Sequence, residues 1–426
     1  MPPAGGDRDF SVVVFGATGV TGRNVAAYLA ERGEQGELGW AAAGRDAEKV
    51  TRVLGEVGVS APEVIVADVS DPASLLEMAS RARVVLNLVG PYTLHGEPVI
   101  EACIASGAHY ADLTGEIPFV RRMIDRHQEA AATAGVKVAN VSGFEALPAD
   151  LAVLLAAETA RERWDEGLAA ADLDADLPTP GGRVGAADII SGGTLQSSAE
   201  ALDDEDAKLV VDPAALIEDP ALAERVREVS PIALAPRFDS EGEVIGPMMP
   251  APFINPAVIH RTAAIVAAEN GRAAEPFRYR EGVVTPGGSS MVPLRYAAAA
   301  ASAGLQAGFR TLVRSRPAVR RRAAAAMRRS LPASGFGPQG ERLEEWRWRV
   351  AVNATTVGGR HVRIDVDAEG HPGYLATARM LGEAGLLLSE PGATPERSGF
   401  LTPAAALGTE RIDRFERARV RFRVSS

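Results

Sequence analysis

The chain has 426 residues, of which 46% are hydrophobic, a length that predicts two domains with a substantial core. Its formal net charge of −11 argues against general nucleic-acid binding, and no group of Cys and His residues has the spacing of a metal site. Its one cysteine, Cys103, allows no disulfide framework, and the sequence lacks both a signal-peptide core and a bilayer-length apolar run, so we expect a cytoplasmic protein.

The first predicted strand, residues 12–15, leads into a glycine-rich turn and then a helix. The turn consists of Gly16, Ala17, Thr18, Gly19, Val20, Thr21 and Gly22. A buried strand that enters a helix through spaced glycines lets backbone N–H groups approach a pyrophosphate at the helix N-terminus. The spacing differs from the G-x-G-x-x-G fingerprint, but a second strand-like run at residues 40–43 completes a βαβ unit. We therefore predict that the turn binds a dinucleotide, rather than being a glycine-rich turn without a ligand.

The end of the second strand selects the cofactor. An acidic residue there accepts hydrogen bonds from a ribose 2′-hydroxyl, whereas an arginine pairs with a 2′-phosphate. This strand ends at Gly44 and Arg45, which favours NADP(H), although the neighbouring Asp46 could favour NAD(H). Arg45 could also simply solvate the start of the next helix.

The third predicted strand, residues 64–66, ends just before Asp68 and Val69. This position suits contact with an adenine edge. Asp68 could instead cap the helix that starts near Pro72, although Ser70 and Asp71 are better placed to do so.

Strand and helix patterns keep alternating up to about residue 145. We predict strands at residues 84–89, 108–113 and 136–141 and helices at residues 98–106 and 119–133. Such alternation indicates a parallel, doubly wound sheet. Ligands of these sheets lie beyond the carboxyl ends of the strands, so Gly90, Pro91 and residues 112–116 should border the cofactor cleft.

The second half of the chain has a different pattern. Apolar and polar residues alternate at residues 346–352, 361–366 and 415–424, which predicts an antiparallel sheet with one covered face. Residues 371–389 have the pattern of an apolar helix that could return to pack on the first domain, and the acidic stretch 164–182 is expected to be an exposed loop.

We therefore predict an α/β protein that has an N-terminal Rossmann-type doubly wound parallel sheet and a second α+β domain with a largely antiparallel sheet. The expected divisions are a cofactor domain at residues 1–145, a substrate and dimerisation domain at 146–385, and a C-terminal segment at 386–426 that completes or packs on both.

One segment of this acidic chain is basic. No Asp or Glu occurs between Gly282 and Gly340, while arginines gather between residues 310 and 329. Apolar residues between the arginines indicate an amphipathic element that meets an acidic partner or a membrane surface. A solvated helix face paired with acidic residues of the same fold is the alternative.

Several motifs together resemble the saccharopine dehydrogenase-like reductases. They are residues 16–22, 90–92, 96–99, 109–116 and 191–194. Residues 254–261 and 401–408 are most similar to the trans-acting enoyl reductases that serve polyketide synthases. The segment 143–150 departs from the family pattern, because Glu145 replaces a shorter carboxylate and Ala146 a hydroxyl, which puts a catalytic role of these positions in doubt.

The resemblance implies an NADPH-dependent reductase of an α,β-unsaturated thioester in polyketide or lipid biosynthesis. It also implies an acyl carrier protein as the acidic partner and a homodimer as one assembly. A carbonyl or imine reductase would use the same cofactor and cleft. A non-catalytic scaffold that binds lipid or protein is a third interpretation, although such a scaffold would not need the glycine turn.

Enoyl reduction requires a hydrogen-bond donor for the thioester oxygen and an acid for the α-carbon. Tyr92 is the first candidate for the donor, and His95 could serve as an acid. His109 and Tyr110 could do the same if they face the cleft, while Asp112 and Glu116 are better suited to orienting partners. The substrate or nicotinamide wall is expected to include Ser191, Gly192, Gly193 and Thr194.

Overall fold

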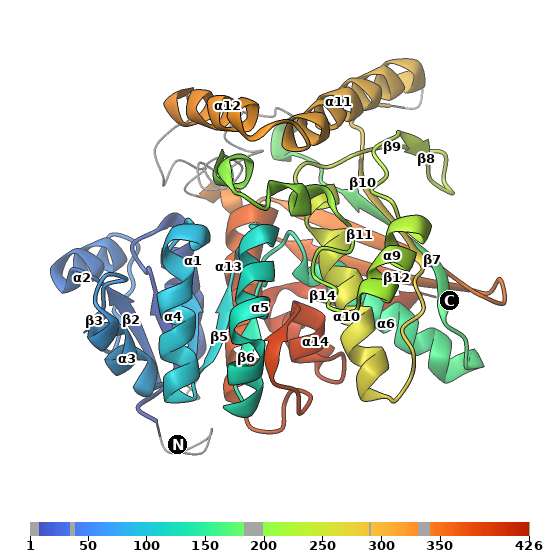
Figure 1. The fold of residues 1–426 in the computed structure, drawn as a ribbon. Coiled ribbons are helices and arrows are strands. Elements are labelled where there is room, and N and C mark those ends of the chain that lie inside the picture. The colour runs from blue at the N-terminus through green and yellow to red at the C-terminus, as the bar shows by residue number, and fades with distance from the viewer. Residues whose placement is uncertain (1–7, 35–38, 183–198, 289–290, 331–340, 426) are drawn as a thin grey trace.

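The computed structural model describes residues 8–34, 39–182, 199–288, 291–330 and 341–425. Two seven-stranded sheets organise these residues, and helices cover them (Figure 1). Within the described residues, no helix is both long enough and apolar enough to cross a lipid bilayer.

The first sheet is entirely parallel, with the strand order β13-β6-β5-β4-β1-β2-β3. Its strands are β1 (Phe10–Phe15), β2 (Trp40–Gly44), β3 (Val64–Val66), β4 (Ala82–Asn87), β5 (His109–Asp112), β6 (Lys137–Ala139) and β13 (Gly399–Leu401). Val12, Val13 and Val14 in the central strand are completely buried. Because helices cover both faces of a parallel sheet, its strands are apolar without alternation.

Helices pack on both faces of this sheet. One face carries α1 (Val20–Glu34), α2 (Ala47–Gly55) and α13 (Thr377–Ser389), and the other carries α3 (Pro72–Ser80), α4 (Tyr92–Ser106) and α5 (Ile117–Thr133). The late helix α13 is buried along its whole length against α1 and β4. This confirms the prediction that an apolar helix within residues 371–389 returns to the first sheet.

Helix α4 begins at Tyr92, several residues before the predicted start near Pro98. Its first backbone N–H groups have no cap from Pro91. Glu116, from the loop after β5, accepts hydrogen bonds from the N–H of Tyr92 at 3.0 Å and of Thr93 at 2.7 Å. The early start therefore depends on a carboxylate from a neighbouring loop, which local sequence does not reveal.

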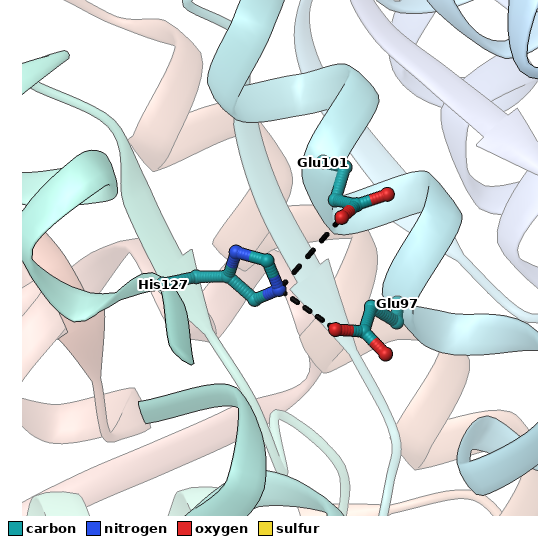
Figure 2. A group of neighbouring side chains, drawn as sticks. All are labelled: Glu97, Glu101 and His127. Atoms are coloured by element: carbon teal, nitrogen blue, oxygen red, sulfur yellow. Dashed lines mark hydrogen bonds and ion pairs between the residues drawn. The ribbon is translucent and has the colours of Figure 1, made fainter. Parts of the chain in front are cut away.

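A side-chain cluster joins α4 to α5 near the surface (Figure 2). His127 Nε2 lies 2.8 Å from Glu97 Oε1 and 4.0 Å from Glu101 Oε1. Arg126 also binds Glu97, at 2.9 Å, so this carboxylate already has a cationic partner. The cluster pairs the two helices on the face opposite the core.

The second sheet has the strand order β14-β12-β11-β7-β10-β9-β8, and all its pairs are antiparallel except β7 with β10. Its strands are β7 (Leu168–Asp176), β8 (Arg237–Phe238), β9 (Val244–Gly246), β10 (Arg278–Val284), β11 (Arg347–Thr356), β12 (His361–Glu369) and β14 (Val420–Ser425). The remaining helices include α6 (Leu147–Trp164), α9 (Pro220–Val229), α10 (Asn255–Glu269), α11 (Val292–Val313), α12 (Pro317–Ser330) and α14 (Pro403–Leu407). Together the two sheets confirm the predicted fold class.

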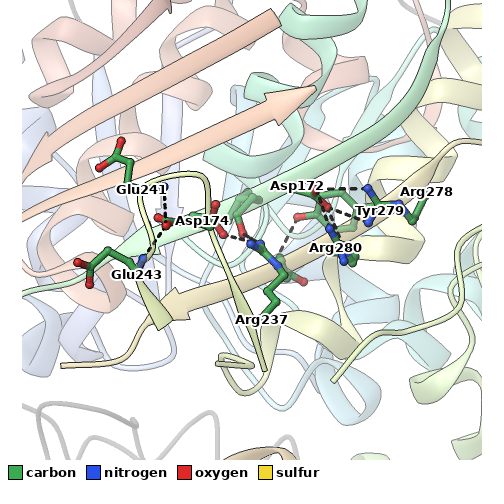
Figure 3. Close-up of polar contacts among 11 residues, drawn as sticks. Asp172, Asp174, Arg237, Glu241, Glu243, Arg278, Tyr279 and Arg280 are labelled. Atoms are coloured by element: carbon green, nitrogen blue, oxygen red, sulfur yellow. Dashed lines mark hydrogen bonds and ion pairs between the residues drawn. The ribbon is translucent and has the colours of Figure 1, made fainter. Parts of the chain in front are cut away.

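Strand β7 overturns the expectation of an exposed loop at residues 164–182. Alternate residues Ala171, Leu173 and Ala175 are buried in the core of the second sheet. The acidic residues between them pair with arginines from β8 and β10 (Figure 3). Arg280 binds Asp172 through two bonds of 2.8 and 2.9 Å, and Arg237 binds Asp174. These distant cations allow an acidic segment to form an internal strand.

Glu383 is a fully buried carboxylate that links α13 to two other elements. It accepts hydrogen bonds from Tyr28 of α1 at 2.5 Å and from Arg414 at 2.9 Å. Removing one partner of a buried ion pair leaves an uncompensated charge. We expect Glu383→Ala to lower the free energy of unfolding by about 3–5 kcal/mol, measured by urea denaturation.

Glu390 provides the matched control, because it also binds Arg414, at 2.8 Å, but is 46% exposed. Glu390→Ala should cost less than about 1 kcal/mol, since exposed pairs contribute little. Equal losses in the two variants would contradict the role given to Glu383.

Two buried carboxyl groups lie where α6, α10 and β10 meet. Burial raises the pKa of Asp150 and of Glu281 to about 7 each. Asp150 accepts hydrogen bonds from Thr262, at 2.5 Å, and from the N–H of Ala404, at 2.8 Å. The folded state favours the neutral form of both carboxyl groups. Their contribution to the free energy of unfolding is therefore present at low pH and is lost as the pH rises through about 7.

We expect each carboxyl group to remove roughly 2 kcal/mol of stability between about pH 5 and pH 7. Asp150→Asn should remove the Asp150 share of this pH dependence and leave the Glu281 share, so the free energy of unfolding should fall about half as steeply over this range. Chemical denaturation at each pH measures it. Asp176→Asn, at an exposed position of β7, should leave the profile unchanged. A wild-type profile that is flat or rises across this range would contradict the prediction.

Candidate functional site

The glycine turn between β1 and α1 is closely packed. A Cβ on Gly22 would lie 2.3 Å from the carbonyl oxygen of Gly16, and Gly16 itself has a φ of +92°. A Cβ on Gly19 would meet only that same oxygen, at 3.5 Å, an ordinary contact distance. Gly16 and Gly22 therefore bring the turn onto the start of α1, and Gly19 leaves room at the helix N-terminus for a phosphate.

A cavity of about 760 Å³ runs along the carboxyl ends of the first sheet. Its lining includes the predicted cofactor residues Gly16, Thr18, Gly19, Val20, Thr21, Gly22, Arg45, Asp68, Val69, Gly90 and Pro91. Ala17 is fully buried and does not line it. The cavity has the size of a cofactor and substrate site.

Two cations lie at the α2 end of the cavity. Arg45 and Lys49 are both exposed and line it, whereas the Asp46 carboxylate accepts a hydrogen bond from the N–H of Lys49 at 2.9 Å and so caps α2. Asp46 is thereby engaged by its own helix. This end fits a ribose 2′-phosphate, and Lys49 is a residue that the sequence analysis missed.

Asp68 does not cap α3, because Asp71 does so by accepting from the N–H of Ala73 at 3.1 Å. The Asp68 carboxylate accepts instead from the N–H and the hydroxyl of Ser70, and these bonds lower its pKa. Asp68 thus stays ionised beside the cavity. An ionised carboxylate at this position can accept hydrogen bonds from a ligand.

Tyr92 contributes its ring to the cavity wall, but its phenol is engaged behind that wall. The O–H donates to the carbonyl oxygen of Asn87, at 3.1 Å, and accepts from the N–H of Leu113, at 3.3 Å. Burial raises the pKa of Tyr92 well above its usual value. Its contacts link the ends of β4 and β5.

His95 lines the cavity one turn into α4 and lies near enough to Asp68 to contribute to the lowered pKa of that carboxylate. The other two candidates that depended on facing the cleft do not line it. His109 accepts from the N–H of Lys137 at 3.1 Å, and the Tyr110 phenol donates to Asp112 at 2.9 Å.

Asp112 is completely buried at the end of β5 and does not line the cavity. Its carboxylate accepts from the N–H groups of Thr114 and Val141, both at 3.1 Å, and from the side chains of Tyr110 and Asn140. Burial raises its pKa to about 6 against the effect of these bonds. By accepting from Thr114 and Val141, the Asp112 carboxylate holds together the loops that follow β5 and β6.

The far half of the cavity is apolar and is built from distant parts of the chain. It includes Leu113, Ala201, Val210, Met249, Phe253, Ile254 and Phe309. Phe253 and Phe309 pack with their ring centroids 5.5 Å apart. The predicted wall residues Ser191, Gly192, Gly193 and Thr194 lie outside the described residues.

Polar residues that line this half include Glu145, after β6, and Tyr374, between β12 and α13. Burial raises the pKa of Glu145, which is half-buried and lines the cavity. The hydroxyl of Thr377 accepts from the N–H of Phe144 at 3.1 Å and donates to the carbonyl oxygen of Pro372 at 2.8 Å. Thr377 therefore fixes the Glu145 turn to the π-helical segment Pro372–Ala376, which carries Tyr374.

Comparison with known proteins places the chain among named relatives. The family model described as the saccharopine dehydrogenase NADP binding domain matches residues 12–138. A trans-acting enoyl reductase of Mycobacterium bovis is 33% identical, with 99% of this chain and 98% of the relative covered. One of Mycobacterium ulcerans is also 33% identical, with 94% of each chain covered.

A solved structure, apo histidine-tagged saccharopine dehydrogenase (L-Glu forming) from Saccharomyces cerevisiae, covers 97% of this chain and 99% of that chain. It is 14% identical, with a TM-score of 0.48. The likeness to the mycobacterial reductases, in contrast, exceeds 30% identity over almost the whole length.

Proposed function

The chain belongs to the family of the trans-acting enoyl reductases, and we propose that it reduces the C=C bond of an α,β-unsaturated thioester with NADPH. The observation that carries the proposal is that one continuous cavity joins the glycine turn and the Arg45 cation to a largely apolar chamber lined by the half-buried acid Glu145. The relatives' name implies a substrate held on another protein, and we propose an acyl carrier protein of polyketide or lipid biosynthesis. The cytoplasmic location expected from the sequence belongs to the same proposal.

The residues present fit an NADP cofactor. Gly19 leaves space at the N-terminus of α1 for the pyrophosphate, and Arg45 with Lys49 suits a 2′-phosphate. Gly90 and Pro91, after β4, border the position of the nicotinamide end in this type of sheet. When bound, NADPH supplies the hydride that adds to the β-carbon of the substrate.

The protein must supply a proton to the α-carbon and stabilise the negative charge on the thioester oxygen. Glu145 suits the first task, because burial raises the pKa of its carboxyl group and so favours the protonated form that can donate. Tyr374 lines the same half of the cavity and suits the second task through its phenol. Water exclusion comes from the apolar wall around them.

The catalytic roles predicted for Tyr92, His95 and Asp112 remain proposals. The bonds of Tyr92 and Asp112 favour positioning of the strand ends, whereas His95 lines the cavity near Asp68. Ser191, Gly192, Gly193 and Thr194 remain candidates for the substrate wall.

The proposal is tested by mixing the purified protein with NADPH and a series of enoyl thioesters, on coenzyme A and on a carrier protein. We expect NADPH oxidation with formation of the saturated thioester, and faster turnover on the carrier. Oxidation only with ketone or imine substrates would establish the alternative reductase. No binding of either nicotinamide cofactor would indicate a non-catalytic scaffold.

A further inference from the structure

Helix α11 buries two polar side chains among the apolar ones of its inner face and exposes leucines on its outer face. Arg295 and Gln306 are buried, at 3% and 4% exposure, and they donate to the carbonyl oxygens of Thr285 and Pro247 at 2.8 and 2.9 Å. Leu294 and Leu305 are 61% and 79% exposed. A surface helix in water has the opposite arrangement, so the outer face of α11 is built for contact with something apolar.

The outer face of α11 forms a continuous strip without charge. Its exposed positions include Leu294, Ala297, Ala298, Ala301, Gly304, Leu305 and Gly308. At 1.5 Å per residue the strip is about 21 Å long. One end carries a stacked aromatic pair, Phe238 and Tyr296, with ring centroids 5.9 Å apart and with both rings partly exposed.

Helix α12 and the link before it supply positive charge beside this strip. The exposed arginines are Arg314, Arg316, Arg321, Arg322 and Arg329. Within the described part of the chain none of these five forms an ion pair, and residues 282–340 contain no Asp or Glu. Figure 1 shows α11 and α12 next to each other along the top of the molecule.

Two arginines of α12 turn back into the fold instead. Arg320 donates to the carbonyl oxygen of Asp204 at 2.8 Å, and Arg328 pairs with Glu200 and Asp203, both at 2.9 Å. These bonds fix α12 in place. The alternative of a helix face paired with acidic residues of the same fold therefore fits Arg328, whereas Arg320 is buried and donates to a backbone carbonyl oxygen.

We propose that the α11–α12 face, defined by the exposed strip of α11 and these five arginines, docks on an anionic lipid surface. An apolar face beside arginines is the combination that binds at the headgroup boundary of anionic membranes. Aromatic rings such as Phe238 and Tyr296 are enriched at that depth. The protein is acidic overall, so this face is the one whose charge complements phosphate headgroups.

The strip suits lipid better than a protein partner. Protein interfaces carry about one hydrogen bond per 100–200 Å², whereas the Leu, Ala and Gly side chains of the strip have no hydrogen-bonding groups. Leu294 and Leu305 also protrude between small residues, which a deformable surface accommodates. At the other end of α11, Phe309 lines the apolar half of the cavity, so the face lies next to the chamber where a long acyl chain would bind.

Vesicle flotation tests this proposal without relying on enzyme activity. We expect the full chain to float with phosphatidylcholine vesicles that contain phosphatidylglycerol. With vesicles of phosphatidylcholine alone, the amount of protein that floats should be about tenfold lower. Arg321→Glu with Arg322→Glu, and separately Leu294→Asp with Leu305→Asp, should each lower binding at least about tenfold. NADPH binding and the melting temperature serve as checks that these variants fold.

Matched controls separate the face from general charge and hydrophobicity. Arg421→Glu with Arg423→Glu, on β14, makes the same charge change, and Leu76→Asp, on α3, removes a leucine that is 44% exposed. Both should leave flotation unchanged. Equal losses in controls and test variants, or no flotation of the wild-type chain, would overturn the proposal.

Two further outcomes would assign the face to another occupant. Arginine-dependent binding to an acidic carrier protein without vesicle binding would make it a protein-docking surface. Dissociation of a dimer by Leu305→Asp, seen by analytical ultracentrifugation, would make it an interface between two copies. Either result would also overturn the proposal.

Discussion

Glu145→Gln is expected to lower kcat by about a hundredfold or more, the usual effect of removing a general acid. Glutamine keeps the size of the side chain but cannot donate an acidic proton to the α-carbon. Because burial raises the pKa of Glu145, wild-type kcat should also fall at pH values above that raised pKa, as the carboxyl group ionises. Stopped-flow measurement of NADPH oxidation with an enoyl thioester would show both effects.

Glu145→Asp is the matched control, because it keeps the acid but shortens its reach. It should retain more activity than the Gln variant, and the NADPH affinity of both variants should stay near that of the wild type. A Gln variant with full kcat and an unchanged pH profile would exclude Glu145 as the proton donor, and Tyr92 and His95 would then be the next residues to test.

Arg45→Ala combined with Lys49→Ala is expected to weaken NADPH binding about tenfold to a hundredfold. Hydrogen bonds to charged groups contribute about 1.5–3 kcal/mol, and because both cations are exposed we expect a total near the lower end, about 1.4–2.8 kcal/mol for the pair. NADH lacks the phosphate that these cations would hold. The affinity for NADH should change less than about threefold. Fluorescence titration with both cofactors measures the two changes.

Arg52→Ala provides the control, because Arg52 is an exposed cation of the same helix that pairs with Glu56 and does not line the cavity. It should leave both affinities unchanged. Equal weakening of NADPH and NADH binding in the double variant would show that the two cations do not read the 2′-phosphate.

The first sheet could be predicted from sequence because its signals are local. The apolar run at residues 12–15, the glycine turn and the alternation of strands with helices each lie within a short window. Strand β7 could not be predicted in this way, because its Asp172 and Asp174 depend on arginines about 60 to 110 positions away. The early start of α4 has the same cause, since Glu116 caps it from another loop.

The two halves of the cavity also differ in whether local sequence signals predict their lining. The cofactor half follows from successive strand ends of one sheet, and its lining includes Gly19, Arg45 and Gly90 as predicted. The substrate half brings together Glu145, Phe309 and Tyr374 through long-range packing, and no periodic pattern joins these positions. The sequence signal in this half is the departure from the family pattern at Glu145, which by itself does not indicate a catalytic role.

Transfer of deuterium from NADPH labelled at the C4 position tests the central claim most directly. The purified chain would be incubated with the labelled cofactor and an enoyl thioester, and the product examined by mass spectrometry and NMR. We expect a saturated thioester with deuterium at the β-carbon and a solvent-derived proton at the α-carbon. Deuterium on a carbonyl or imine carbon of an added competitor substrate, with the enoyl thioester unchanged, would contradict enoyl reduction.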